Sequence, residues 1–174
     1  MKKILITGAT GFLGSRLVEK ISTINGLEIL ATGRTLKTQN ISNKSNLEYV
    51  LGNLEDTKFI DSLTSGIDTI IHTAALSSQM GNPKDFHRTN IEVTKNLLKA
   101  AKAKRVKKFI FISSPSVYFR FKHQLDLKES DILPKPINTY SSSKREAEKL
   151  IQSSGIPHVI LRPRALIGRE IGKS

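Results

Sequence analysis

The architecture follows from residues 7–14, which are Thr7-Gly8-Ala9-Thr10-Gly11-Phe12-Leu13-Gly14. They lie between a short apolar run, Lys3–Thr7, that predicts a buried strand and an amphipathic segment, Phe12–Thr23, that predicts a helix. Phosphate binds to backbone N–H groups at the start of such a helix, and glycines let it approach closely. The G-x-x-G-x-x-G spacing differs from the commonest dinucleotide fingerprint, and an ordinary glycine-rich turn is the alternative. The position between strand and helix favours a phosphate-binding loop.

Apolar strands and amphipathic helices alternate along the rest of the chain. Further strands are expected over Glu28–Thr32, Leu47–Leu51, Thr69–His72, Lys108–Ser113 and His158–Leu161. Helices are expected over Thr57–Leu63, Lys84–Ala103 and Tyr140–Ser153, and loops over Lys37–Asn46 and Phe119–Pro136. This alternation predicts an α/β fold of the Rossmann type, with a doubly wound parallel sheet in the order 3-2-1-4-5-6. Residues 1–174 then form one NAD(P)-binding domain.

The end of the second expected strand distinguishes between the two nicotinamide cofactors. An NAD site usually has an acid there to bind the ribose 2′-hydroxyl, but this strand ends in Ala31-Thr32-Gly33-Arg34. A guanidinium can pair with a 2′-phosphate, and Lys37 can add charge. A solvated loop arginine is the alternative. We therefore expect NADP, with NAD as the second choice.

Tyr140 and Lys144 are four residues apart at the start of an expected helix and share a face. An ammonium beside a phenol stabilises the phenolate, which makes a tyrosine usable as a general acid or base. This spacing also arises by chance in a lysine-rich chain, so Ser114 adds weight. It lies at the carboxyl end of an expected strand, where a hydroxyl can bind a substrate oxygen. Ser113 and Ser116 are close rivals.

These motifs resemble, over essentially the whole chain, the extended short-chain dehydrogenase/reductase family, also called the NAD-dependent epimerase/dehydratase family. Similar segments are Gly52-Asn53-Leu54-Glu55-Asp56, with Asn53 in place of the usual Asp near the adenine, then His72-Thr73-Ala74-Ala75, Phe111–Tyr118 and Leu161-Arg162-Pro163-Arg164. The register of the Phe111–Tyr118 segment selects Ser114, and Asn90, with Thr94, resembles the helix asparagine that helps to position the active-site lysine. The resemblance implies four catalytic residues: Ser114, Tyr140, Lys144 and Asn90. It implies cofactor binding by Gly8, Thr10, Gly11, Phe12, Leu13, Gly14, Arg34, Asn53, Leu54, Thr73, Ala74, Ala75, Tyr140 and Lys144.

The function implied by the resemblance is NADP-dependent carbonyl reduction or alcohol oxidation of a small-molecule substrate. Two alternatives are an NAD-dependent epimerase acting on a nucleotide sugar and a non-catalytic NADP-binding sensor or scaffold. Pro115-Ser116 stand where dehydratases of the family carry an acidic pair, so dehydration is not expected. Family members continue into a small substrate-binding domain, which we expect to be largely absent here. They often pair through the helices matching Lys84–Ala103 and Tyr140–Ser153, so a homodimer is a candidate assembly.

Composition and charge bear on the location of the protein and on the ligands that it binds. The chain has 174 residues, no cysteine and a formal net charge of +13. It has no apolar run long enough to span a bilayer, and its four histidines are scattered, so we expect a cytoplasmic protein without a bound metal. The densest basic cluster, Lys102 to Lys108, lies at an expected helix end, where the helix dipole favours cations. No aromatic residues interleave with it, so nucleic-acid binding is not expected.

Overall fold

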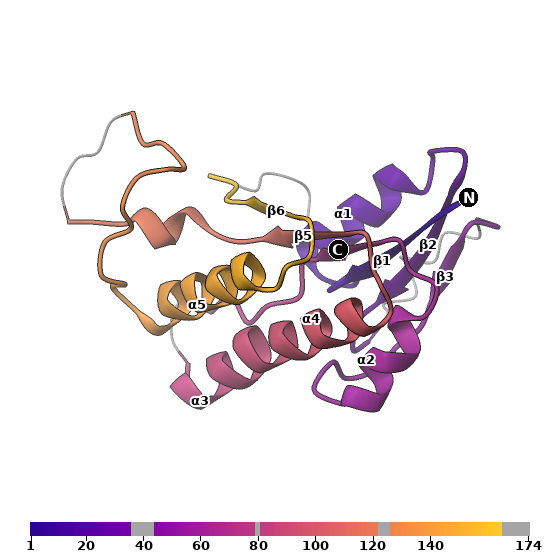
Figure 1. Cartoon of the computed structure of the whole chain (residues 1–174), viewed down its shortest axis with the longest axis horizontal. Coiled ribbons are helices and arrows are strands. Elements are labelled where there is room, and N and C mark those ends of the chain that lie inside the picture. The colour runs from indigo at the N-terminus through magenta and orange to yellow at the C-terminus, as the bar shows by residue number, and fades with distance from the viewer. Residues whose placement is uncertain (36–43, 79–80, 122–125, 165–174) are drawn as a thin grey trace, which may run out of the picture.

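The six strands form one parallel sheet in the order β3-β2-β1-β4-β5-β6, which confirms the predicted fold (Figure 1). The computed structural model describes residues 1–35, 44–78, 81–121 and 126–164. The strands are β1 (Lys2–Thr7), β2 (Leu27–Thr32), β3 (Leu47–Tyr49), β4 (Thr69–His72), β5 (Lys108–Ile112) and β6 (His158–Leu161). Part of the expected loop Lys37–Asn46 lies outside the described residues.

Helices cover both faces of the sheet. The helical elements are α1 (Phe12–Ile21), α2 (Thr57–Thr64), α3 (Pro83–Phe86), η2 (His87–Glu92), α4 (Val93–Ala103), η3 (Pro115–Tyr118) and α5 (Thr139–Ser153). Figure 1 shows α2, α4 and α5 along one face and α1 along the other. Among the described segments, no helix combines the length and the apolar character that crossing a bilayer requires.

Two apolar layers hold the helices to the sheet. On the larger side, Phe109 and Phe111 of β5 pack with Leu97 of α4 and Ile151 of α5, and all four are almost fully buried. On the smaller side, Val18 of α1 packs against strands β1 and β2. Successive residues of one strand enter opposite layers, which is why the strands have few polar positions.

The expected single helix Lys84–Ala103 is divided into α3, a π-helical segment η2 and α4. The apolar residues Val93, Leu97, Leu98 and Ala101 are buried as the spacing predicted. The π-helical turn has no signature in that apolar spacing, so periodicity alone could not reveal it. Such turns are rare and frequently lie at functional sites.

The chain leaves β1 for β2 on one side and reaches β4 on the other, so the strand order reverses between β1 and β4. Ligands of doubly wound sheets bind outside the carboxyl ends of the strands at such a point. The glycine loop follows β1, and residues 73–75 follow β4, so both segments lie at this edge. The fold therefore brings the predicted motifs together.

The large core layer makes a prediction about stability. Phe109 is 0% exposed, whereas Phe121 is 88% exposed. Replacing Phe109 with Ala should lower the free energy of unfolding by about 3–5 kcal/mol because it leaves a cavity beneath α4 and α5. Phe121→Ala, the matched control, should change it by no more than about 0.5 kcal/mol. Urea unfolding followed by circular dichroism measures both, and equal effects would contradict the described core.

Candidate active site

Two cavities lie at the carboxyl edge of the sheet. The first, of about 340 Å³, is lined by Gly8, Thr10, Gly11, Gly33, Arg34, Thr35, Gly52, Asn53, Leu54, Glu55, Thr73, Ala74, Ala75, Thr89 and Val93. The second, of about 330 Å³, is lined by Gly8, Gly11, Phe12, Leu13, Gly14, Thr73, Ala75, Ser77, Ile112, Ser113, Ser114, Pro115, Tyr140, Lys144 and Pro163. Gly8, Gly11, Thr73 and Ala75 line both, so the cavities adjoin at the glycine loop.

The glycine loop is packed too tightly for side chains at two positions. Gly8 has φ +70°, and a Cβ there would lie 2.6 Å from the backbone nitrogen of Ala74. A Cβ on Gly14 would lie 2.1 Å from the carbonyl oxygen of Gly8. Helix α1 begins after Gly11 without a side-chain cap and without an acid in its first turn. Its N-terminal N–H groups and dipole are therefore left for an anion, which fits the pyrophosphate of a dinucleotide.

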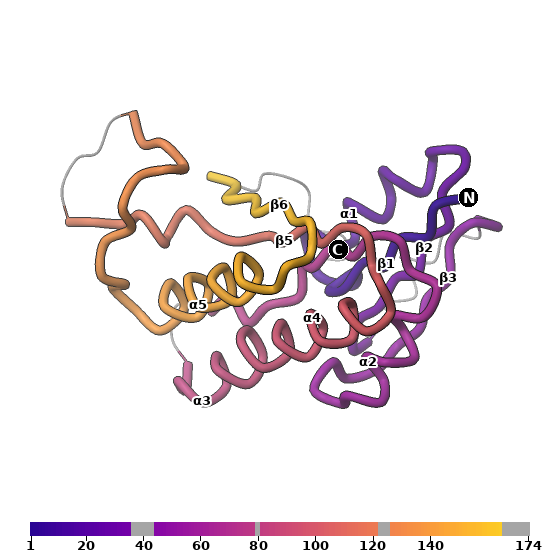
Figure 2. The backbone as a smooth tube through the Cα atoms, viewed as in Figure 1, coloured from indigo at the N-terminus to yellow at the C-terminus, as the bar shows by residue number. Residues whose placement is uncertain are grey.

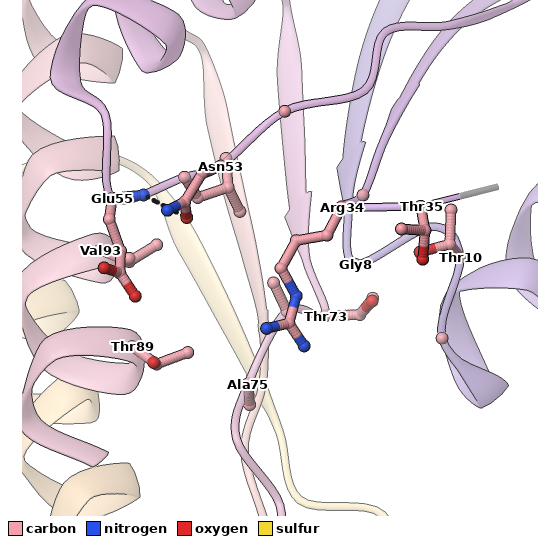
Figure 3. A pocket seen from close by; sticks show the side chains of 15 residues that line it. Gly8, Thr10, Arg34, Thr35, Asn53, Glu55, Thr73, Ala75, Thr89 and Val93 are labelled. Carbon is pink, nitrogen blue, oxygen red and sulfur yellow. Dashed lines mark hydrogen bonds between the residues drawn. The ribbon is translucent and has the colours of Figure 1, made fainter. Parts of the chain in front are cut away.

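Arg34 and Glu55 set the charge of the first cavity. Figure 3 shows the Arg34 side chain extending from the end of β2 into the cavity. Glu55, the single acid among the described lining residues, pairs with Arg88, whose Nε lies 3.0 Å from a carboxylate oxygen. Within the described segments no carboxylate forms an ion pair with Arg34. Arg34 is therefore the cation of the described lining that is left for an anionic ligand; Lys37 lies outside the described residues.

Asn53 contributes to a turn at the same end. Its side-chain oxygen accepts a hydrogen bond from the Glu55 backbone at 3.1 Å, drawn as a dashed line in Figure 3. The amide oxygen that replaces the family's carboxylate is thus engaged locally, while the side-chain NH₂ is a donor.

Tyr140 and Lys144 both line the second cavity, on the first turns of α5. Asn138 and Ser141 form a reciprocal capping box that holds the start of this helix. Lys144 is 3% exposed, its Nζ donates to the Ile112 carbonyl at 2.8 Å, and it lies 4.6 Å from the centre of the Phe111 ring. Burial lowers the pKa of Lys144 to about 8, although the nearby Glu148 carboxylate acts in the opposite direction. This amine can therefore lose its proton within the range of ordinary enzyme assays.

The three candidate serines have different surroundings. Ser114 Oγ accepts a hydrogen bond from the Ser116 backbone at 3.2 Å, which leaves its own hydrogen available to a substrate oxygen. Ser113 Oγ is buried without a hydrogen-bond partner among the described residues, and Ser113 also lines the second cavity. Ser116 does not line that cavity. Ser114, the predicted catalytic serine, thus lines the same cavity as Tyr140 and Lys144.

A buried hydrogen-bond chain connects the end of β1 to α4. Thr94 Oγ1 donates to the Asn90 carbonyl at 2.7 Å, so it must accept from His72 Nε2 at 3.0 Å. His72 Nδ1 then has no hydrogen and accepts from Thr7 Oγ1 at 2.6 Å. Burial, followed by the charge of Lys144, lowers the pKa of His72 to about 3, which agrees with a neutral ring. His72 is thus a fixed structural connector rather than a general acid.

Asn90 joins three segments from the π-helical turn. Its side-chain oxygen accepts from the Leu76 backbone at 2.7 Å, and its NH₂ donates to the Leu76 carbonyl at 3.0 Å and to Ser143 Oγ at 2.9 Å. Both amide hydrogens are therefore used, and neither partner is Lys144 itself. Asn90 holds the loop after β4 and the residue preceding Lys144, so any effect on the lysine passes through the backbone of α5.

The predicted cofactor-binding residues and Ser114 all line one of the two cavities, whereas Asn90 lies behind them. Lining residues that the sequence did not identify are Gly33, Thr35, Gly52, Glu55, Thr89, Val93, Ser77, Ile112, Pro115 and Pro163. Six of these residues lie in segments already singled out in the sequence, which could have identified them: Gly33, Gly52, Glu55, Ile112, Pro115 and Pro163. In the described ranges, no group of three or more His, Asp or Glu side chains could hold a metal ion.

Known proteins match the chain in sequence and in structure. The model of the NAD dependent epimerase/dehydratase family matches residues 4–174. A 4-hydroxy-2-methyl-3-oxo-4-farnesyl-3,4-dihydroquinoline-1-oxide ketoreductase of Stigmatella aurantiaca is 28% identical over 97% of this chain and 51% of its own length. Human dTDP-D-glucose 4,6-dehydratase is 33% identical over 87% of this chain and 46% of its own length.

A UDP-glucuronic acid 4-epimerase from Bacillus cereus, crystallised with NAD, superimposes with a TM-score of 0.80. It is 31% identical, and the match covers 92% of this chain and 55% of that one. The chain thus spans about half the length of the relatives that it matches. These relatives share the fold and include a reductase, a dehydratase and an epimerase.

The close backbone contact at Gly14 makes a prediction. Gly14→Ala should lower the free energy of unfolding by about 1–3 kcal/mol, because the new Cβ collides with a carbonyl that cannot move freely. Gly11→Ala is the matched control, since its Cβ would meet only the Gly8 oxygen, at 3.2 Å. It should change stability by less than about 1 kcal/mol. Urea unfolding without cofactor measures both variants, and a Gly14→Ala protein as stable as the wild type would refute this packing.

Proposed function

The chain belongs to the NAD dependent epimerase/dehydratase family, and from the geometry of its two cavities we propose that it acts as an NADP-dependent oxidoreductase that reduces a carbonyl or oxidises an alcohol. One observation carries the proposal: Tyr140, Lys144 and Ser114 line a single cavity that adjoins the glycine-loop cavity. Its substrate, and the activity of a whole protein as long as the relatives, are part of the proposal.

The residues present fit a dinucleotide. The uncapped start of α1 and the glycine loop would hold the pyrophosphate, and Arg34 would pair with a 2′-phosphate. Lys144 would hold the nicotinamide ribose at the other end. When bound, the nicotinamide supplies hydride transfer, and the protein contributes placement and electrostatics.

Each catalytic side chain then has a distinct task. Ser114 donates its free hydrogen to the substrate oxygen and orients it beside Tyr140. Tyr140 gives a proton to that oxygen in reduction and takes one in oxidation. The Lys144 ammonium stabilises the phenolate that forms on Tyr140 in reduction. Because the Lys144 amine is anchored on the Ile112 carbonyl, its position does not depend on the substrate.

An NAD-dependent nucleotide-sugar epimerase is the second candidate. The superimposable Bacillus cereus enzyme, whose crystal contains NAD, favours it. Arg34 favours the NADP-dependent reductase instead, because a guanidinium at the end of β2 pairs better with a 2′-phosphate than with a 2′-hydroxyl. NAD that remains bound through purification would favour the epimerase over the reductase.

Cofactor choice provides a direct test. We expect NADP to bind more tightly than NAD and therefore to raise the thermal unfolding midpoint more at equal concentrations. A ligand at a hundred times its dissociation constant adds about 2.7 kcal/mol to the free energy of unfolding, which is a measurable shift. Arg34→Ala should weaken NADP binding by about tenfold or more, through loss of a charge-assisted contact, and leave NAD binding unchanged. Arg105→Ala removes an equal charge before β5, at the opposite end of the strands, and should preserve the preference. A wild type that binds both cofactors equally would refute the assignment.

Tyr140→Phe tests the catalytic role. This variant should show the wild-type thermal shift with cofactor but lose at least about a hundredfold in turnover, because the proton donor is gone. NADPH consumption with a panel of aldehydes and ketones measures turnover. Tyr49→Phe in β3 removes a phenol that lines neither cavity and should be fully active. Full activity of Tyr140→Phe would exclude it as the proton donor, and cofactor binding without turnover in the wild type would favour a sensor or scaffold.

A further inference from the structure

Glu148 is a buried carboxylate one helical turn beyond Lys144 on α5. Tyr140, Lys144 and Glu148 follow one another at intervals of four residues, so they share the face of the helix that meets the sheet. Glu148 is 2% exposed and the single acid among the fully buried residues of the described segments. A carboxylate in such a place is strongly unfavourable unless it is paired and hydrogen-bonded.

Arg162 provides that pairing. Its Nε lies 2.8 Å and its Nη2 2.7 Å from the two oxygens of Glu148, a bidentate geometry. The hydrogen bond with Glu148 is the main reason that the pKa of Arg162 is raised. This contact holds the Glu148 side chain and the Arg162 guanidinium together in the buried layer.

The pair also connects the walls of the catalytic cavity. Arg162 follows β6, which lies beside α5 in Figure 2, and precedes Pro163, a lining residue of the second cavity. Its Nη1 donates to the hydroxyl of Tyr118, and its guanidinium carbon lies 4.7 Å from the centre of the Tyr118 ring. Arg162 thus fixes the turn η3 after Ser114 and the end of β6 against α5.

Among the described residues, few charged groups face Lys144. From β4 it meets His72, which is neutral, and from β5 a carbonyl and an aromatic ring. The segment η2, packed against α5, turns Asn90 inward, while its ionisable residues His87, Arg88 and Glu92 have side chains that are between 39% and 60% exposed. On α5 itself the neighbours are Tyr140 and Glu148, with Arg162 beyond. Glu148 is therefore the carboxylate that acts on Lys144.

We propose that Glu148 is a positioning residue: held in place by the bidentate contact with Arg162, it stabilises the Lys144 ammonium one turn away and keeps the Tyr140–Lys144 pair ready for proton transfer. This inference rests on the proposed function for Tyr140 and Lys144. Burial already lowers the pKa of Lys144 to about 8, and Glu148 limits that fall. Without the carboxylate the pKa falls further, so a larger fraction of Lys144 is neutral at neutral pH, and a neutral amine stabilises a phenolate poorly.

The titration of Lys144 can be measured without turnover. Although Lys144 is only 3% exposed, its side chain lines the second cavity, through which acetic anhydride can reach it. Trace acetylation from pH 6 to 10, read at Lys144 by mass spectrometry, gives its midpoint. We expect a wild-type midpoint near 8 and a decrease of about one unit or more in Glu148→Gln. Glu146→Gln, which removes an exposed carboxylate from the same helix, should leave the midpoint unchanged.

Two more variants separate charge from packing. Glu148→Asp retains the carboxylate and should restore most of the wild-type midpoint. Glu148→Gln with Arg162→Gln removes the pair without leaving a buried unpaired charge, so it serves if the single variant does not fold, and it should lower the midpoint as well. The alkaline limb of the turnover profile should move by the same amount.

A Lys144 midpoint within about 0.3 units of the wild type in Glu148→Gln, or in the double variant, would overturn the proposal and leave the pair a packing element. Because labelling needs no substrate, an inactive wild-type protein would count against the proposed function and not against the role of Glu148. A shifted midpoint with a fully active Tyr140→Phe would, conversely, support the role of Glu148 and refute the role of the tyrosine.

Discussion

The site depends on how closely the backbone around Gly8 approaches two other segments, the first turn of helix α1 and the loop after β4. Gly14 lies against the carbonyl of Gly8, and Gly8 lies against Ala74 after β4. Any Cβ at these positions would push α1 away from the sheet or the β4 loop away from β1. Since the two cavities share Gly8, Gly11, Thr73 and Ala75, this approach also determines how the phosphate end and the catalytic end adjoin.

The polar interior extends that constraint toward the catalytic helix. Thr7, His72 and Thr94 pass hydrogen bonds in one direction to the Asn90 carbonyl, and the Asn90 side chain binds Ser143, which precedes Lys144. Each donor is engaged, so a tautomer change at His72 would leave a buried group without its partner, at a cost of about 1–3 kcal/mol. The low pKa of His72 is consistent with a neutral ring, because burial and then the charge of Lys144 disfavour the imidazolium. Asn90 lies in the π-helical turn, and its side chain binds both Leu76 after β4 and Ser143 on α5.

Sequence alone predicted the features that depend on local spacing. The glycine loop, the strand order and the Tyr140–Lys144 pair each follow from residues close together in the chain or from the alternation of elements. The π-helical turn could not be predicted in this way, because Val93, Leu97 and Leu98 are buried in either helix type. The Glu148–Arg162 pair could not be predicted either, because its members are 14 residues apart and meet only when β6 lies beside α5. Glu148 did continue the Tyr140–Lys144 interval, but a carboxylate on a helix is ordinarily solvated, and only its burial distinguishes it.

The two cations of the site differ in a way that net charge could not indicate. Arg34 is exposed, whereas Lys144 is buried, and that burial lowers the pKa of Lys144 to about 8. In the densest basic cluster, Lys102 to Lys108, two lysines are paired with carboxylates: Lys104 with Asp61 and Lys107 with Asp68. Both lysines lie before β5, away from the carboxyl edge of the sheet. The surplus of +13 therefore says little about binding. Proton transfer should depend on pH through Lys144 and the Glu148 side chain one turn away, whereas Arg34 serves the proposed site through its position at the end of β2.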